Sequence, residues 1–268
     1  MFFLYIRNMN KFTFTASVCV AFFFAACGDD GGSATRPSEE SSSSVALSSS
    51  SSSVIPSSSS SKVTESAEVT KGSITDTRDG HSYKTVTIGS QTWMAQNLNY
   101  ETVNSYCYSD NASNCTKYGR LYTWAAAMDS VGSWSANGKG CGYGKTCSPT
   151  YPVRGVCPEG WHLPTQTEWN TLFTAVGGQS TAGKMLKSTS GWNSSGNGTD
   201  AYSFSALPAG GRGGNGHFNY EGNNAYFWSS TDDNSYYAYS MILYYNGDYA
   251  GLDDGNEGYG FSVRCVKD

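Results

Sequence analysis

One segment of the chain, residues 213–263, concentrates side chains that could bind a saccharide. Its 51 residues include 13 aromatics, seven asparagines and seven acids, with no lysine or arginine. Aromatic rings cover the apolar faces of sugars, while amide and carboxylate groups bond to the hydroxyls. Tyr249 follows an Asn246-Gly247-Asp248 turn and Tyr259 lies among glycines. We therefore expect a ligand site that includes Asn246, Asp248, Tyr249 and Tyr259. The alternative is that the tyrosines fill a glycine-rich core.

Two acidic stretches in this segment carry the oxygen ligands that calcium prefers. They are Asp232-Asp233-Asn234 and Asp253-Asp254-Gly255-Asn256-Glu257. Because calcium is a hard cation bound by carboxylate and carbonyl oxygens, the acids of both stretches are candidate ligands. Neither stretch has EF-hand spacing, so the alternative is that these acids are solvated turn residues. Calcium is the one cofactor that the sequence suggests.

No group of residues has the composition and spacing of a catalytic site. Glu168 stands three positions after Thr165, so a capping box explains it. His162 follows Trp161 and is expected to be structural. The glycine-rich residues 210–214 lack the strand and helix context of a phosphate loop, which favours a flexible loop. We therefore do not expect an enzyme.

Six cysteines could staple the chain: Cys107, Cys115, Cys141, Cys147, Cys157 and Cys265. An even number in an exported domain is typical of disulfides, although sequence alone leaves many pairings open. Short loops favour Cys107–Cys115 and Cys141–Cys147, which leaves Cys157 to pair with Cys265. The alternative is a zinc site, but there is no C-x-x-C motif and the three histidines lack ligand spacing.

The N-terminal 27 residues are typical of a bacterial lipoprotein signal. A weakly basic start and a short apolar stretch precede Phe24-Ala25-Ala26-Cys27, which is similar to a lipobox. Cys27 is the expected lipidation site, although an ordinary cleaved signal is the alternative. Acids at Asp29 and Asp30 are similar to surface-export signals, so we expect a lipid-anchored protein at the outer membrane or cell surface. A solvated linker would also explain them.

Composition divides the rest of the chain into a tether and one folded domain. Residues 38–61 contain 16 serines in 24 positions, too polar to form a core. We expect a disordered tether over residues 28–72 and a domain over residues 73–268. The net charge of −5 and a pI near 5.2 argue against a nucleic-acid partner. No apolar run is long enough to span a membrane.

Short patterned runs predict the elements that must position these side chains. Alternation predicts strands over residues 83–89 and 91–94, and apolar spacing predicts helices over residues 118–130 and 165–176. A short helical turn is expected over residues 182–188. Further strands are expected over residues 227–230, 236–245, 248–252 and 260–266. Tyr237 and Tyr239 share a strand face with Met241 and Leu243, so we expect them to pack inside. The fold class is α+β.

A series of motifs resembles the Fibrobacter succinogenes major paralogous domain over about residues 74–267. The motifs are Gln91-Thr92-Trp93-Met94-Ala95, Tyr118-Gly119-Arg120-Leu121-Tyr122, Cys157-Pro158-Glu159-Gly160-Trp161-His162-Leu163-Pro164-Thr165, Phe227-Trp228-Ser229-Ser230 and Ser262-Val263-Arg264-Cys265. Gln96 departs from the glutamate usual in that family. Members are typically exported lipoproteins behind serine-rich linkers, and no biochemical activity is established for the family.

A more distant similarity bears on the fold. Leu163-Pro164-Thr165-x-x-Glu168-Trp169 and Arg264-Cys265-Val266 are similar to the frame of formylglycine-generating-enzyme-like domains, which implies a C-type-lectin-like fold. That enzyme uses a pair of cysteines near its C-terminus. Cys265 stands alone here, so the oxidase activity is not carried over.

Three functions are compatible with these observations. The first is a surface-tethered binding module for plant cell-wall polysaccharide, as the family's cellulolytic host implies. The second is an envelope scaffold that binds other proteins, and the third is a divergent enzyme of the formylglycine-generating-enzyme-like fold.

Overall fold

The computed structural model describes residues 69–268. The signal, Cys27 and the serine-rich stretch lie outside the described residues. Within the described part no helix is long and apolar enough to cross a membrane. The elements form an α+β domain with antiparallel sheets and three disulfides.

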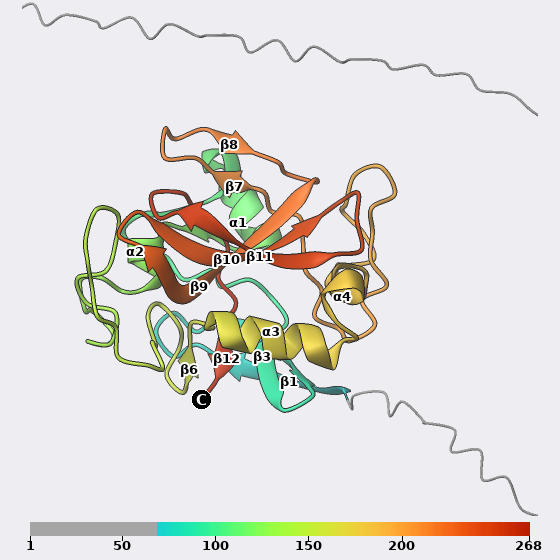
Figure 1. Ribbon diagram of the computed structural model, residues 1–268, viewed down its shortest axis with the longest axis horizontal. Coiled ribbons are helices and arrows are strands. Elements are labelled where there is room, and N and C mark those ends of the chain that lie inside the picture. The colour runs from blue at the N-terminus through green and yellow to red at the C-terminus, as the bar shows by residue number, and fades with distance from the viewer. Residues whose placement is uncertain (1–68) are drawn as a thin grey trace, which may run out of the picture. The chain divides into compact units, whose positions relative to one another are not determined.

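A five-stranded antiparallel sheet joins the two ends of the domain (Figure 1). Its order is β1 (Val69–Thr75), β2 (Ser82–Ile88), β3 (Gln91–Met94), β12 (Val266–Lys267) and β6 (Trp161–His162). The last strand therefore lies between β3, from the start of the domain, and β6, from its middle. The first strand begins at Val69, four residues before the expected start of the domain.

A second sheet, in the order β11-β10-β9, presents two different faces. Its strands are β9 (Asn224–Asn234), β10 (Tyr237–Tyr244) and β11 (Ala250–Asn256). Ser240 pairs with Trp228 and Asp253, and Ile242 pairs with Tyr226 and Gly251. Because side chains alternate along a strand, these six residues share one face, which we call the cleft face.

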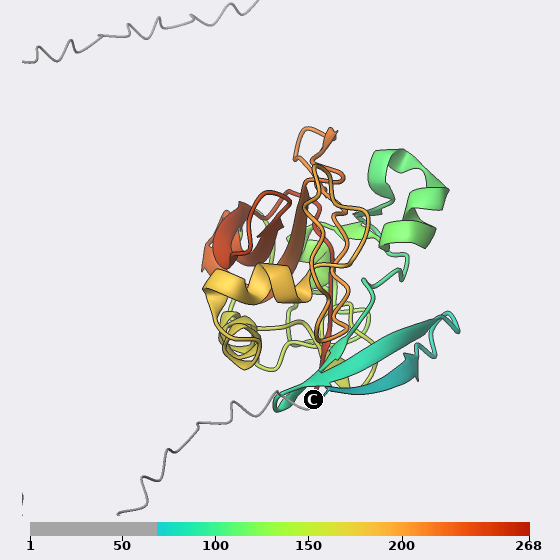
Figure 2. The same ribbon diagram turned by 90° about the vertical axis from the view of Figure 1, so that its right-hand side faces the viewer.

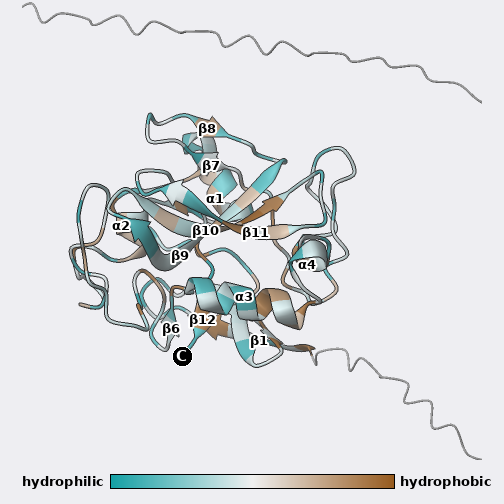
Figure 3. Ribbon diagram, in the orientation of Figure 1, coloured by the Kyte–Doolittle hydropathy of each residue, from teal (hydrophilic) through white to brown (hydrophobic). Residues whose placement is uncertain are grey.

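The opposite face of this sheet packs against two helices, α3 (Gln166–Ala175) and α4 (Gln179–Leu186). Met241, Leu243 and Phe227 are fully buried there, within a core that also holds the stacked rings of Trp93 and Trp169, 4.6 Å apart. Figure 3 shows the hydrophobic stretches of α3 and β11 in brown.

Two expectations about this face are wrong. Tyr237 is 39% exposed and Tyr239 is half-buried. The Tyr239 hydroxyl donates to Asp233 Oδ1 at 3.1 Å, at the exposed end of the β9–β10 pair. The predicted alternation along the strand is correct, but of these residues only Met241 and Leu243 are buried in the core.

The predicted helix over residues 165–176 is confirmed, with its capping box. The Thr165 hydroxyl accepts from the Glu168 amide, and the Glu168 carboxylate accepts from the Thr165 amide. The short helical turn expected at residues 182–188 is the longer α4, which begins at Gln179.

The predicted helix over residues 118–130 is wrong. Tyr118 ends α1 (Ala112–Tyr118), and Gly119 follows with a φ of 73°. Leu121 and Tyr122 form β5 (Leu121–Tyr122), paired with β4 (Ser105–Tyr106). Thr123 is extended and caps the four-residue α2 (Trp124–Ala127). The apolar residues at helical spacing therefore lie in a strand and in a short helix, separated by the capping residue, and not in one continuous helix.

Three disulfides pair the six cysteines as the loop lengths favour. They are Cys107–Cys115, Cys141–Cys147 and Cys157–Cys265. The last spans 108 positions and joins the segment before β6 to the residue before β12.

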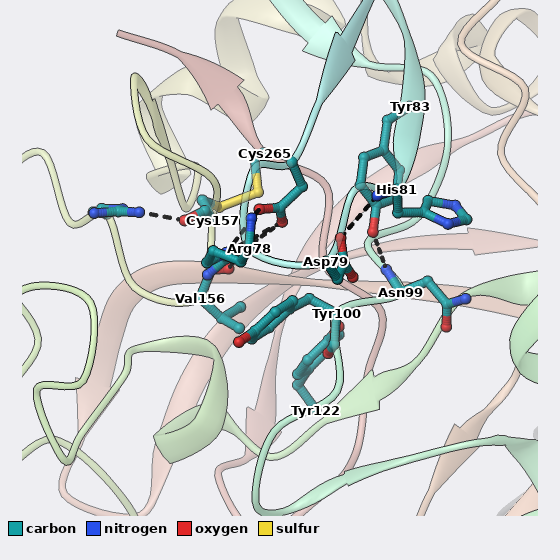
Figure 4. Close-up of polar contacts among 12 residues, drawn as sticks. Arg78, Asp79, His81, Tyr83, Asn99, Tyr100, Tyr122, Val156, Cys157 and Cys265 are labelled. Atoms are coloured by element: carbon teal, nitrogen blue, oxygen red, sulfur yellow. Dashed lines mark hydrogen bonds and ion pairs between the residues drawn. A yellow bond between two sulfur atoms is a disulfide. The ribbon is translucent and has the colours of Figure 1, made fainter.

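A guanidinium supports the region around that long-range disulfide. Arg78 forms an ion pair with Asp76 at 2.7 Å and donates to the Val156 carbonyl at 2.8 Å. Its guanidinium also lies 3.9 Å from the centre of the Tyr100 ring. Figure 4 shows Arg78 between Tyr100 and the Cys157–Cys265 bridge.

Candidate functional site

A cleft of about 910 Å³ lies between the cleft face and a small hairpin. The hairpin consists of β7 (Gly211–Arg212) and β8 (Phe218–Asn219). Figure 2 shows it in orange beside the red strands of the sheet. The loop of the Cys141–Cys147 disulfide contributes Tyr143, and the segment after β11 contributes Tyr259 and Phe261.

The floor of the cleft is built from stacked rings. Phe261 is buried and nearly parallel to Tyr226, with ring centroids 4.6 Å apart and planes 13° apart. Two glycines permit this packing. A Cβ at Gly255 would lie 2.7 Å from Phe261, and one at Gly211 would lie 3.0 Å from it.

Tyrosines with accessible rings surround this floor. Tyr143, Tyr220, Tyr244 and Tyr259 all line the cleft, and each has between 38% and 58% of its surface exposed. Rings that remain exposed in the folded protein can stack on a ligand without first leaving a core.

Hydrogen-bonding groups lie between the rings. Asn215, Asn219, Asn256, Ser240, Asp253 and Asp254 also line the cleft. Asp253 pairs with Ser240 on the cleft face and is exposed. Burial raises the pKa of the Tyr226 and Tyr244 hydroxyls, and the negative charge of Asp253 raises both further. Asp253, Tyr226 and Tyr244 all line the cleft.

Arg212 is the one basic residue among those that line the cleft. Its guanidinium lies 3.9 Å from the centre of the Tyr106 ring and 5.8 Å from that of Phe218. Neither ring lines the cleft. Within residues 69–268 the Arg212 side chain has no acidic partner. Arg212 thus packs the hairpin against β4, and the cleft lining is aromatic and amide-rich, with two acids and one base.

One comparison with known proteins gives a match, and that match is to a protein family. A family model described as the Fibrobacter succinogenes major domain matches residues 86–267. The chain belongs to this family. The comparisons with curated proteins and with solved structures give no match. The cleft described above is therefore a feature of a Fibrobacter succinogenes major domain.

Of the four ligand residues predicted from the sequence, one lines the cleft of this family member, namely Tyr259. Asn246 and Asp248 lie at the end of the sheet near α4, where Asp248 is 4.0 Å from Lys184. Tyr249 is exposed, and its ring lies against Gly251 on the cleft face, outside the cleft lining.

The five acids proposed as calcium ligands lie on or just after two strands of one sheet. Among residues 69–268 no three histidine, cysteine, aspartate or glutamate side chains converge to hold a metal ion. Asp232 and Asp233 lie on β9, while Asp253 and Asp254 lie on β11. Glu257 is 1% exposed, and neither carboxylate oxygen has a hydrogen-bond partner in the described residues. Burial raises the pKa of Glu257 to about 7, with a smaller contribution from Asp232.

His162 and Glu168 form a structural contact. His162 Nε2 lies 2.7 Å from Glu168 Oε1, and Nδ1 lies 2.7 Å from Asp268 Oδ1. Burial opposes the charged imidazole, but the hydrogen bonds to both carboxylates outweigh it and raise the pKa of His162. Both ring nitrogens are occupied, so this trio ties the end of the chain to β6 and α3.

Sequence reasoning missed the hairpin that forms one wall of the cleft. Residues 210–214 were expected to be a flexible loop, whereas Gly211–Arg212 forms β7 and pairs with Phe218–Asn219. A glycine-rich run next to an aromatic-rich segment is a signal of close backbone approach, and it could have pointed to this wall.

Proposed function

We propose that this domain is a binding module for polysaccharide, with plant cell-wall polysaccharide as the ligand class. The observation that carries the proposal is the cleft, in which four exposed tyrosines surround amide and carboxylate side chains. This combination suits sugars because a pyranose ring has apolar faces and a rim of hydroxyls.

The size and openness of the cleft support a chain-like ligand. A volume of about 910 Å³ lies at the upper end of the range for small-molecule sites. Accessible tyrosines occur at separate places along it, from Tyr143 on the disulfide loop to Tyr220 after the hairpin. Successive sugar units of one polysaccharide could therefore contact different rings.

The direct test is retention of the full chain on insoluble polysaccharides, compared between two matched variants. Tyr259 and Tyr237 are 41% and 39% exposed, but only Tyr259 lines the cleft. We expect Tyr259→Ala to weaken retention and Tyr237→Ala to leave it unchanged, with similar melting temperatures. Absence of retention across cellulose, xylan, mannan and pectin would contradict the proposal and favour the protein-binding scaffold.

The proposed location is the cell surface, where a lipid on Cys27 would hold the protein and the serine-rich stretch would separate the domain from the membrane. Replacing Cys27 with Ser should release the protein from the membrane fraction. A variant that still partitions with detergent like the parent would contradict lipidation.

For the fold we propose a relationship to C-type-lectin-like domains. It is supported by the placement of the last strand between β3 and β6 and by the long-range disulfide Cys157–Cys265. We propose binding rather than catalysis, because the two residues first considered for catalysis, His162 and Glu168, bond to each other in a structural contact. A crystal structure whose strand order and long-range disulfide do not superpose on those of a C-type-lectin-like domain would contradict the relationship.

A further inference from the structure

The cleft holds a carboxylate with no counter-charge. Asp253 lies on the cleft face and lines the cleft together with Tyr226 and Tyr244. Among residues 69–268 it forms no ion pair with a lysine, arginine or histidine, and the one basic residue of the lining stacks on Tyr106 instead. Because Asp253 and Asp254 line the cleft against one base, Arg212, a ligand in the cleft meets a net negative charge.

We propose that Asp253 makes the cleft select uncharged sugars and reject uronic acids, an inference that rests on the proposed polysaccharide binding. The carboxylate accepts hydrogen bonds from sugar hydroxyls, since an ionised carboxylate is only an acceptor. A sugar carboxylate in the same place would offer no donor and would be repelled. At separations of a few ångströms, this repulsion reduces affinity by about tenfold or more.

Asp233, on β9 of the same sheet, provides a matched control outside the cleft. It does not line the cleft, and its Oδ1 accepts from the Tyr239 hydroxyl at 3.1 Å. Asp253 and Asp233 are both exposed and both carry one negative charge. Replacing either one with Asn changes the net charge equally, but only Asp253→Asn removes a charge from the cleft lining.

The experiment measures retention of the full chain on pairs of polysaccharides that share a backbone and differ in carboxylates. The pairs are cellulose and C6-oxidised cellulose, xylan and glucuronoxylan, and methyl-esterified and de-esterified homogalacturonan. We expect the parent to bind a neutral member at least about tenfold more tightly than its acidic partner. The difference in affinity between the neutral and acidic members should narrow as the salt concentration is raised, because exposed charges are screened.

The variants decide whether Asp253 is responsible. Asp253→Asn should bring the affinities for the two members of a pair to within about twofold of each other, while Asp233→Asn should keep most of the parent's preference. Equal binding of neutral and acidic members by the parent would overturn the inference while leaving polysaccharide binding intact. An unchanged preference in Asp253→Asn would also overturn it. If the parent binds none of the neutral polysaccharides, the proposed function itself is overturned and this inference with it.

Discussion

The ring of Phe261 lies almost flat against the ring of Tyr226, 35 positions earlier in the chain, with centroids 4.6 Å apart. Phe261 also contacts Trp228, at a centroid distance of 4.5 Å. The exposed tyrosines of the cleft thus surround a floor of stacked rings, and this floor is part of the core. Because the floor is close-packed, a small change beneath it should alter both the stability of the domain and the shape of the cleft.

Replacing Gly255 with Ala tests this coupling. The added Cβ would lie 2.7 Å from Phe261 and 3.2 Å from Trp228, so the rings must shift. We expect a loss of about 1–3 kcal/mol in unfolding free energy, as for overpacked cores, together with weaker retention on polysaccharide. Gly247→Ala is the control, since its Cβ would meet nothing closer than 3.9 Å. It should change stability by less than about 0.5 kcal/mol. Equal behaviour of the two variants in urea unfolding would refute a close-packed floor.

The three disulfides should contribute unequally to stability. In the chain-entropy treatment, the bridge Cys157–Cys265, which closes 108 positions, contributes about 5 kcal/mol. The bridges that close eight and six positions contribute about 2 kcal/mol each. Replacing both cysteines of each pair with Ala, one pair at a time, should reproduce this order in denaturant midpoints. A local pair as costly as the long-range one would show that strain or packing dominates.

The sequence predicts those elements whose signals are local. The helix at Gln166–Ala175 is predicted within one residue at each end, because Thr165 and Glu168 form a cap that requires no distant partner. The segment 118–130 misleads because Leu121 and Trp124 are both buried, one in a strand and the other in a short helix. The spacing of buried residues alone does not distinguish a strand followed by a short helix from one continuous helix.

The cleft depends on contacts that spacing does not encode. Tyr143, Asn219 and Asp253 come from three separate parts of the chain and meet only when the hairpin and disulfide loop close over the sheet. Most of the cleft lining comes from the segment 213–263. Which of its tyrosines reach the cleft depends on strand register: Tyr244 lines it, whereas Tyr237 lies on the opposite face.

The contact between His162 and Asp268 should stabilise the domain most at acidic pH. The pKa of His162 is raised in the folded state, so its contribution is complete below the ordinary value of 6.5 and is lost as pH rises through the folded pKa. The side chain of Asp268 is 51% exposed. Asp268→Asn should therefore cost only about 0.5 kcal/mol at pH 5.5, and less at pH 8.5. Thermal unfolding at both pH values checks this, and a larger loss at pH 8.5 would contradict it.

Glu168 adds the opposite dependence at lower pH. Its burial alone would raise its pKa, but bonds to His162 and Thr165 lower it below the ordinary value of 4.5. Its contribution is present above that value and is lost as pH falls through the folded pKa. The Asp268→Asn comparison is therefore made above pH 5, where Glu168 remains ionised.

Glu257 should make the domain less stable as pH rises from about 4.5 to 7. Burial raises the pKa of its unpartnered carboxyl from an ordinary 4.5 to about 7. Over that interval the folded state holds a proton that the unfolded state has released, so the unfolding free energy falls with increasing pH. Gln has nearly the same shape and cannot ionise. Glu257→Gln should therefore be more stable than the parent at pH 8, by up to about 3 kcal/mol, and nearly equal to it at pH 4.

The control for this last variant is Glu159→Gln, which removes the same charge at an exposed position. Urea unfolding from pH 4 to pH 8 should show a shallower decline for Glu257→Gln and a parent-like decline for Glu159→Gln. His162 contributes to the decline in all three proteins, so the difference between the curves isolates Glu257. If Glu257→Gln is instead less stable than the parent at pH 8, the ionised carboxylate must have a partner that stabilises its charge. Burial would then no longer be the dominant effect on that group.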